Sequence, residues 1–313
     1  MNGLQLAEAY YKEYGEAMID LQFPELKGKI AVGLIGSGSE CLGYDDEISK
    51  DHDFEPGFCI FIPGEEEVDS KACFRLERAY AKLPDEFMGY SRQKVSPVGG
   101  NRHGVIRLDE FLSDKTGYPS GELGMADWFR IPEYSLLEVT NGKIFYDGWG
   151  RLTKIRENLH YLPEDVRRKK LAGHLLTMAQ AGQYNYYRLV NRKEFGAAQL
   201  AVTEFVKSGI QVAYLLNSTY MPYYKWAFRG MRDLPKLAEL EEVFTMLLCT
   251  PNDGDYSLKK SNAIEDTAGM IILMLKEQGL TQADCGDLEK HAYSVNDSVK
   301  DNEIRYLNIF AAV

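Results

Sequence analysis

The feature that most constrains the fold is a short apolar run, Ile30–Ile35, which ends at the sequence Gly36-Ser37-Gly38-Ser39. Such a run, followed by glycine and serine, predicts a buried β-strand that leads into a tight turn. Glycine permits close backbone approach, and the N–H groups and hydroxyls of such a turn suit phosphate oxygens. Gly36, Ser37 and Ser39 are therefore candidate phosphate-binding residues. A turn that only connects two elements is the alternative interpretation.

A pair of carboxylates follows the predicted turn. Thirteen residues separate Ser37 from Asp51, and Asp53 precedes a second apolar run, Phe58–Ile62. Residues two apart in a strand face the same way, so Asp51 and Asp53 would together hold a cation that prefers oxygen ligands. The pair is predicted to bind magnesium or manganese. An acidic, solvated strand edge is the alternative.

Hydrophobic periodicity divides the chain into two parts. Up to about residue 123, helical patterns at 3–22 and 65–83 alternate with strand patterns. After about Gly124 long helical periods follow, at 127–139, 163–191, 195–217, 234–248 and 257–278. These patterns predict the α+β class, with a small mixed-sheet domain over residues 1–123 and an all-helical bundle over residues 124–313.

The spacing of Gly36-Ser37, Asp51-x-Asp53 and a downstream strand resembles the polymerase-beta-like nucleotidyltransferase superfamily. The resemblance implies an enzyme dependent on magnesium and ATP, which moves a nucleoside monophosphate to a hydroxyl of a small molecule. The superfamily adds a third carboxylate on a later strand. Asp109, at the end of the predicted strand 103–108, is the candidate here, and a helix cap is its alternative role.

Later segments resemble the uncharacterised helical domain that follows nucleotidyltransferase domains in many bacterial proteins. They are Ile131-Pro132-Glu133, Gly142–Asp147, Leu159-x-Tyr161-x-Pro163 and the stretch from Leu215 to Trp226.

The two-domain layout also resembles antibiotic nucleotidyltransferases, which implies a cleft between the domains for nucleotide and acceptor. In that interpretation Lys225 steadies the triphosphate, and Tyr223, Asn185 and Arg188 line the acceptor pocket. A surface lysine along Trp226, and a polar network inside the bundle, are the alternatives.

Composition narrows the possible partners. Thirty-six basic and forty-seven acidic side chains give a net charge of −11 without a dense basic block, which disfavours a nucleic-acid partner. Five widely spaced cysteines form no C-x-x-C pair, which argues against a zinc or redox motif. Neither a signal segment nor a run long enough to span a bilayer is apparent, so a cytoplasmic protein with no membrane partner is expected.

Two other functions remain open at this point. The first is a nucleotide-binding regulatory module that has lost catalysis, which the missing strand carboxylate allows. The second is a transferase that acts on a protein or tRNA acceptor.

Overall fold

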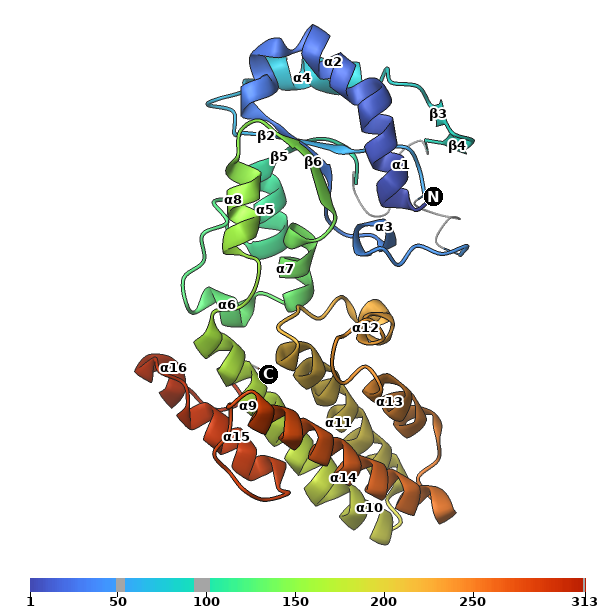
Figure 1. Ribbon diagram of the computed structural model, residues 1–313, viewed down its shortest axis with the longest axis vertical. Coiled ribbons are helices and arrows are strands. Elements are labelled where there is room, and N and C mark those ends of the chain that lie inside the picture. The colour runs from blue at the N-terminus through green and yellow to red at the C-terminus, as the bar shows by residue number, and fades with distance from the viewer. Residues whose placement is uncertain (49–53, 93–101, 312) are drawn as a thin grey trace. The chain divides into compact units, whose positions relative to one another are not determined.

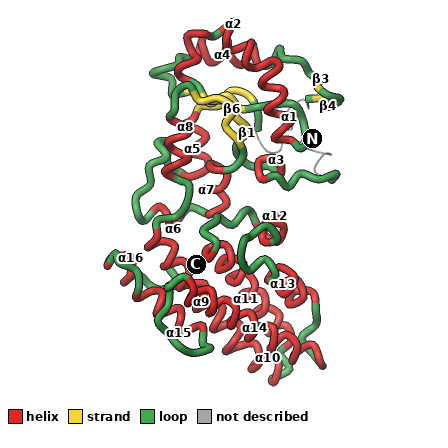
Figure 2. Tube along the Cα trace, in the orientation of Figure 1, coloured by secondary structure: helices red, strands yellow, loops and turns green. Residues whose placement is uncertain are grey.

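The computed structural model describes residues 1–48, 54–92, 102–311 and 313, which form two compact units (Figure 1). The first unit holds residues 1–124 and 131–160, and the second holds residues 125–130 and 161–313. The strands assigned in the described residues all belong to the first unit, and they are yellow in Figure 2. The predicted α+β class, with a small mixed sheet and a helical C-terminal region, is confirmed.

The first unit is built on a four-stranded mixed sheet in the order β5-β2-β1-β6. Its strands are β1 (Ala31–Leu34), β2 (Cys59–Ile62), β5 (Gly104–Arg107) and β6 (Lys143–Asp147). β1 pairs antiparallel with both β2 and β6, and β2 pairs parallel with β5. A separate two-stranded hairpin joins β3 (Glu86–Phe87) to β4 (Tyr90–Ser91). The three strand patterns expected before residue 123 match β1, β2 and β5.

Helices cover both faces of this sheet, which explains why β1 and β2 are buried on both sides. On one face Val32, Ile60 and Ile62 pack in a cluster with residues of α1, α2 and α4. On the other face the Phe61 ring contacts Phe111 of α5, with ring centroids 5.2 Å apart. Alternate residues of a strand point to opposite faces, so each apolar run supplies two layers at once.

The helical segments of the first unit have clear local causes. Asn2 and Gln5 form a capping box at the first helix, Asp69 caps α4 by accepting from the Ala72 N–H at 2.7 Å, and Pro24 follows the end of α2. The segments are α1 (Gly3–Tyr10), η1 (Tyr11–Gly15), α2 (Glu16–Gln22), η2 (Pro24–Lys29), α3 (Ser39–Leu42), α4 (Ser70–Tyr80), α5 (Leu108–Thr116), α7 (Glu133–Thr140) and α8 (Arg151–Asn158).

The domain boundary predicted after residue 123 differs from this division. Residues 131–160, expected in the helical bundle, belong to the first unit. They supply α7, α8 and the edge strand β6, whose Phe145 ring stacks on Tyr11 at 5.8 Å. The Tyr146 hydroxyl also donates to the Lys27 carbonyl at 2.9 Å. The five residues of β6 lie between the predicted helical periods 127–139 and 163–191, and a segment this short gives too weak a periodicity to indicate a strand.

The second unit is helical throughout its described residues. Its segments are α6 (Asp127–Arg130), α9 (Glu164–Met178), η4 (Ala179–Tyr186), α10 (Tyr187–Asn191), α11 (Phe195–Leu216), α12 (Tyr224–Met231), α13 (Leu240–Cys249), α14 (Gly254–Glu277), α15 (Leu288–Asp297) and α16 (Asn302–Tyr306). The segment η4 is a π-helix that continues directly from α9. Within the described residues, none of the helices has the length and hydrophobicity that crossing a bilayer requires.

Polar side chains are buried in the core of the second unit. Lys260 is fully buried, and its Nζ donates to Oδ1 of Asn252 at 2.9 Å and to Oε1 of Gln199 at 3.3 Å. His174 is buried in α9, and its Nδ1 has no hydrogen-bond partner in the part of the chain that is described. Burial, assisted by the positive charge of Lys170, lowers the pKa of His174 to about 3.

Candidate functional site

The turn after β1 is shaped by two glycines. Gly36 has a φ of +126° and Gly38 a φ of +144°, in a backbone region that other residues rarely adopt. A Cβ atom at Gly38 would also lie 2.2 Å from Oε1 of Glu40. Ser37 and Ser39 are half-buried in the same turn. The structure thus brings the three predicted phosphate-binding residues together, in a turn whose shape depends on glycine.

A distant segment fixes this turn. Asn141, which is 105 residues away, accepts from the Gly36 N–H at 3.1 Å and donates from Nδ2 to the Gly36 carbonyl at 2.8 Å. The next residue, Gly142, donates its N–H to the Cys41 carbonyl at 3.0 Å. A Cβ atom at Gly142 would lie 1.9 Å from the Leu34 carbonyl oxygen. The segment therefore approaches β1 as closely as only glycine allows, and it holds the Gly36 backbone from both sides.

Ionisable side chains occur near the turn and the segment that holds it. Glu40 is buried, at 5% exposure. Burial, together with the Glu40 charge, raises the pKa of the Cys41 thiol, while Arg102 acts in the opposite direction. Arg156 donates from Nη2 to the Thr140 carbonyl at 2.6 Å, and its buried Nη1 has no hydrogen-bond partner among the described residues.

The chain enters β2 at the same end of the sheet. Gly33 near the end of β1 pairs with Cys59 at the start of β2. Phe54, five residues before Cys59, is buried. Asp51 and Asp53, the predicted metal ligands, lie outside the described residues. Within the described residues, no group of three or more His, Cys, Asp or Glu side chains is arranged to hold a metal ion.

An ionisable pair that was not predicted from the sequence lies at this end of the sheet. Nδ1 of His103 lies 3.0 Å from Oε1 of Glu55. A Cβ atom at Gly57 would meet the His103 ring at 2.7 Å, so glycine makes room for the pair. The next residue, Gly104, pairs with Cys59. A signal was present, because the two-residue spacing of the predicted acidic pair continues to Glu55.

Asp109 lies at the other end of the sheet. It is the second residue of α5, which begins directly after β5, and the last residue of β5, Arg107, pairs with Ile62. The three steps from Gly104 to Arg107 span about 10 Å at 3.3 Å per residue. Asp109 Oδ1 accepts from the Glu110 N–H at 2.9 Å within the first turn of α5. The structure therefore does not bring Asp109 to the turn after β1.

Asp109 instead lines a cleft of about 380 Å³. The other lining residues are Pro63, Gly64, Glu65, Glu66, Glu67, Leu108, Trp149 and Arg151.

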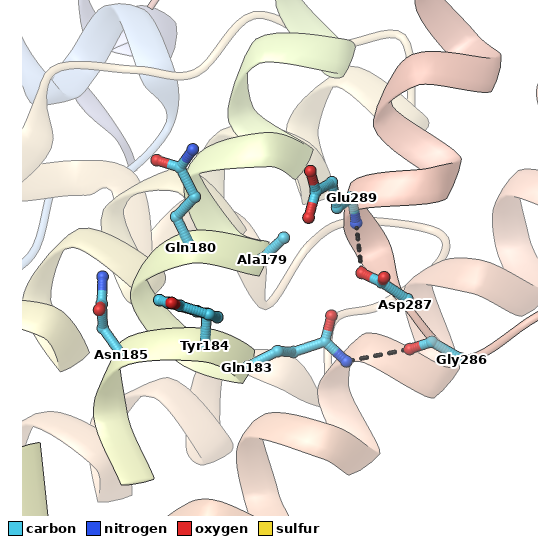
Figure 3. A pocket seen from close by; sticks show the side chains of 8 residues that line it. All are labelled: Ala179, Gln180, Gln183, Tyr184, Asn185, Gly286, Asp287 and Glu289. Atoms are coloured by element: carbon cyan, nitrogen blue, oxygen red, sulfur yellow. Dashed lines mark hydrogen bonds between the residues drawn. The ribbon is translucent and has the colours of Figure 1, made fainter. Parts of the chain in front are cut away.

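Two of the predicted acceptor-pocket residues lie close together in the second unit. Asn185 lines a pocket of about 490 Å³ beside Tyr184 (Figure 3). Arg188 covers the Tyr184 ring, with its guanidinium carbon 3.9 Å from the ring centroid, and Nη1 donates to the Tyr184 hydroxyl at 2.9 Å. Arg188 therefore positions an aromatic side chain of the pocket.

Tyr223 is separated from that pair within the same unit. It precedes α12, beyond the C-terminal end of α11, whereas η4 and α10 lie near the other end of α11 (Figure 1). Lys225 is exposed, with its Nζ 5.2 Å from the Trp226 ring centroid, which is the contact expected of a surface lysine. The contact of Lys225 with a triphosphate, and the cleft between domains, stay predictions.

One family model matches this chain. It is described as a domain of unknown function (DUF4037), and it covers residues 128–227. The chain is thus similar to that family across α7, β6 and α8 of the first unit and α9 to α11 of the second. A comparison with curated proteins finds no match, nor does one with solved structures. The resemblance of the later segments to an uncharacterised domain has support in this match, and the nucleotidyltransferase resemblance stays a prediction.

Proposed function

We propose that this chain is a metal-dependent nucleotidyltransferase, which moves a nucleoside monophosphate from ATP to a hydroxyl of a small molecule. The observation that carries the proposal is the turn at Gly36–Ser39. Its two glycines hold conformations that favour close approach of a ligand, and Asn141 fixes its backbone. Beside it begins β2, six residues after Asp53.

The turn has the groups to orient a polyphosphate. The Ser37 and Ser39 hydroxyls donate to phosphate oxygens, and glycine at 36 and 38 lets the backbone approach them. Together these groups place the triphosphate without new backbone strain.

A divalent cation suits the expected ligands by their chemistry. Asp51 and Asp53 supply carboxylate oxygens, the ligands that magnesium and manganese prefer. When bound, the metal neutralises charge on the triphosphate.

The reaction that fits is an in-line displacement. The acceptor hydroxyl oxygen forms a bond to the α-phosphorus, the bond to pyrophosphate breaks, and the hydroxyl proton passes to a base. Asp109 lies beyond the far end of β5, whose residues Gly104 to Arg107 span about 10 Å, so Glu55 or His103 is better placed by topology to receive that proton.

A nucleotide-binding module without turnover is the second candidate, and the position of Asp109 favours it. Such a module would bind ATP and magnesium without releasing pyrophosphate. Calorimetry with magnesium and ATP, beside a pyrophosphate-release assay over a panel of hydroxyl acceptors, separates the two. Binding without release for every acceptor supports the module.

The carboxylate pair is tested by Asp51→Asn and Asp53→Asn. Each substitution keeps the size of the side chain and removes a charged metal ligand, so pyrophosphate release should fall at least about 100-fold. Glu47→Gln, an exposed acid of the same region, is the matched control and should keep full turnover. Unchanged turnover in both aspartate variants would show that the site is elsewhere.

A further inference from the structure

The pocket in the second unit is formed on one side by the π-helical segment η4. Its inner face is buried, and at Gly182 a Cβ atom would lie 2.4 Å from the Phe205 ring. Its outer face carries Gln180, Tyr184 and Asn185 (Figure 3). Hydrogen bonds from i to i+5 stack residues four and five apart, so both Tyr184 and Asn185 lie over Gln180. A regular α-helix would place Asn185 further round the helix.

The opposite side of the pocket is the start of α15, with Gly286, Asp287 and Glu289. Gln183 ties the two sides together. Its Nε2 donates to the Gly286 carbonyl at 2.9 Å, and its Oε1 accepts from the Leu288 N–H at 2.9 Å. The two walls are therefore held at a fixed separation before any ligand binds.

The backbone N–H groups at the start of α15 already donate hydrogen bonds within the protein. The Leu288 N–H donates to Gln183, the Glu289 N–H to Oδ1 of Asp287, and the Lys290 and His291 N–H groups to the Asp287 carbonyl. Helix N-termini bind anions through such groups when they are free. This one offers none to an anion.

The charge of the pocket also disfavours an anionic ligand. Asp287 and Glu289 are both acids, and none of the eight lining residues is a lysine or arginine. Arg188, just outside, is held on the Tyr184 ring. Asp287 and Glu289 therefore give the pocket a local negative potential that attracts positive charge.

Two amides and an aromatic ring remain for a ligand. Within the described residues, the side chains of Gln180 and Asn185 form no hydrogen bond, so each offers donors and an acceptor to the pocket. Tyr184 is 56% exposed and held in place by Arg188. Paired amides match neighbouring hydroxyls, and a fixed aromatic ring packs on a saturated ring or a cation.

We propose that this pocket is a binding site for a small, positively charged, hydroxyl-rich molecule of the amino sugar class. Its volume of about 490 Å³ lies within the range of small-molecule sites, about 300–1,000 Å³. The amides bind hydroxyls, Tyr184 packs on the ring, and Asp287 and Glu289 bind the ammonium group. The site belongs wholly to the second unit, so it does not depend on nucleotide transfer in the first.

The test uses three ligands that share a ring and differ in charge: glucosamine, glucose and glucuronate. Chemical shifts of the full-length protein are followed by NMR as each ligand is added. Glucosamine should bind at least about 10-fold more tightly than glucose, and glucuronate should not bind. Absence of a saturable shift with glucosamine, or equal affinity for all three, would overturn the proposal.

Matched variants locate the site. Tyr184→Ala and Glu289→Gln should each weaken glucosamine binding at least about 5-fold. Tyr187→Ala and Glu242→Gln, at exposed residues of the same types that do not line the pocket, should leave it unchanged. All four positions are exposed, so the fold should persist in each variant. Binding that weakens equally in a variant and its control would place the ligand elsewhere and refute the assignment.

Discussion

The turn in the first unit and the pocket in the second are made in opposite ways. The turn depends on backbone shape: two glycines with positive φ, a third glycine against the Leu34 carbonyl, and one amide that holds Gly36. The pocket depends on side chains displayed by a π-helical segment, and the backbone N–H of Leu288 on its opposite side is already paired with Gln183. Substitutions should therefore affect folding at the turn and ligand binding at the pocket.

The largest effect on stability is expected for Gly142→Ala. The added methyl group would meet the Leu34 carbonyl, and the residue has a φ of +61°. We expect a loss of about 3 kcal/mol or more in the free energy of unfolding, because the backbone must move. Chemical denaturation of the first unit, followed by hydrogen exchange, measures it. Gly28→Ala, with open space around its Cβ, should cost less than about 1 kcal/mol.

Acid should affect the second unit through His174. The pKa falls from 6.5 to about 3 on folding, so the unfolded chain binds more protons between these values and stability is lost as the pH falls through them. At pH 5 the loss is about 2 kcal/mol, since 1.5 pKa units correspond to about that energy.

The variant His174→Leu should abolish this loss of stability with falling pH, measured in the second unit by hydrogen exchange at pH 5 and pH 7. His160→Leu, at an exposed histidine, should retain the loss. A second unit that is equally stable at both pH values in the unsubstituted protein would contradict the buried, neutral state of His174.

The variant Asn141→Ala tests whether the side chain that fixes the turn also contributes to nucleotide binding. Two hydrogen bonds to Gly36 are lost, which should cost about 1 to 2 kcal/mol of stability. Affinity for ATP with magnesium should fall as well, whereas glucosamine binding in the second unit should be unchanged. Asn158→Ala, an exposed asparagine at the end of α8, is the control. Unaltered ATP affinity in Asn141→Ala would detach the turn from nucleotide binding.

The smallest effect concerns Lys260, buried with amide partners in the second unit. Burial lowers its pKa below that of an unfolded lysine. The unfolded chain then binds more protons in the interval between the two pKa values, so stability rises with pH there. Relative to Lys260→Met, the unsubstituted protein should gain stability from pH 7 to pH 10. The neighbouring exposed Lys259→Met should show no such trend.

Local features of the fold were predictable, whereas features made by distant segments were not. The strand at 30–35 and its glycine turn depend on residues that are adjacent in the sequence, and the structure contains both, as β1 and the turn at Gly36. The hold of Asn141 on that turn spans 105 residues, and the sequence marks Asn141-Gly142 only as a turn. The pairing of β6 with β1 was not predicted for the same reason, because it also joins segments that are far apart in the sequence.

The pocket shows the same limit. Asn185 lines this pocket of the second unit, whereas its predicted role in an acceptor pocket between the domains stays a prediction, and Asp287 and Glu289 come from about a hundred residues later. A periodicity of 3.6 residues predicted one helix over 163–191, and the π-helical geometry inside it has no such signal. Asp109 was chosen by its place in the sequence, and the direction of β5 carries it to the far end of the sheet.

The hold of Asn141 on Gly36 also sets an order of events during synthesis. Until residues 141–147 leave the ribosome, β1 lacks its outer neighbour and exposes unpaired backbone groups, as an open sheet edge does. A chain stopped at residue 123 should therefore aggregate, whereas one extended to residue 160 contains every strand of this sheet that the structure describes. The sheet of the first unit is therefore completed only after residue 147 is synthesised, and until then its open edge at β1 is available for pairing with other chains.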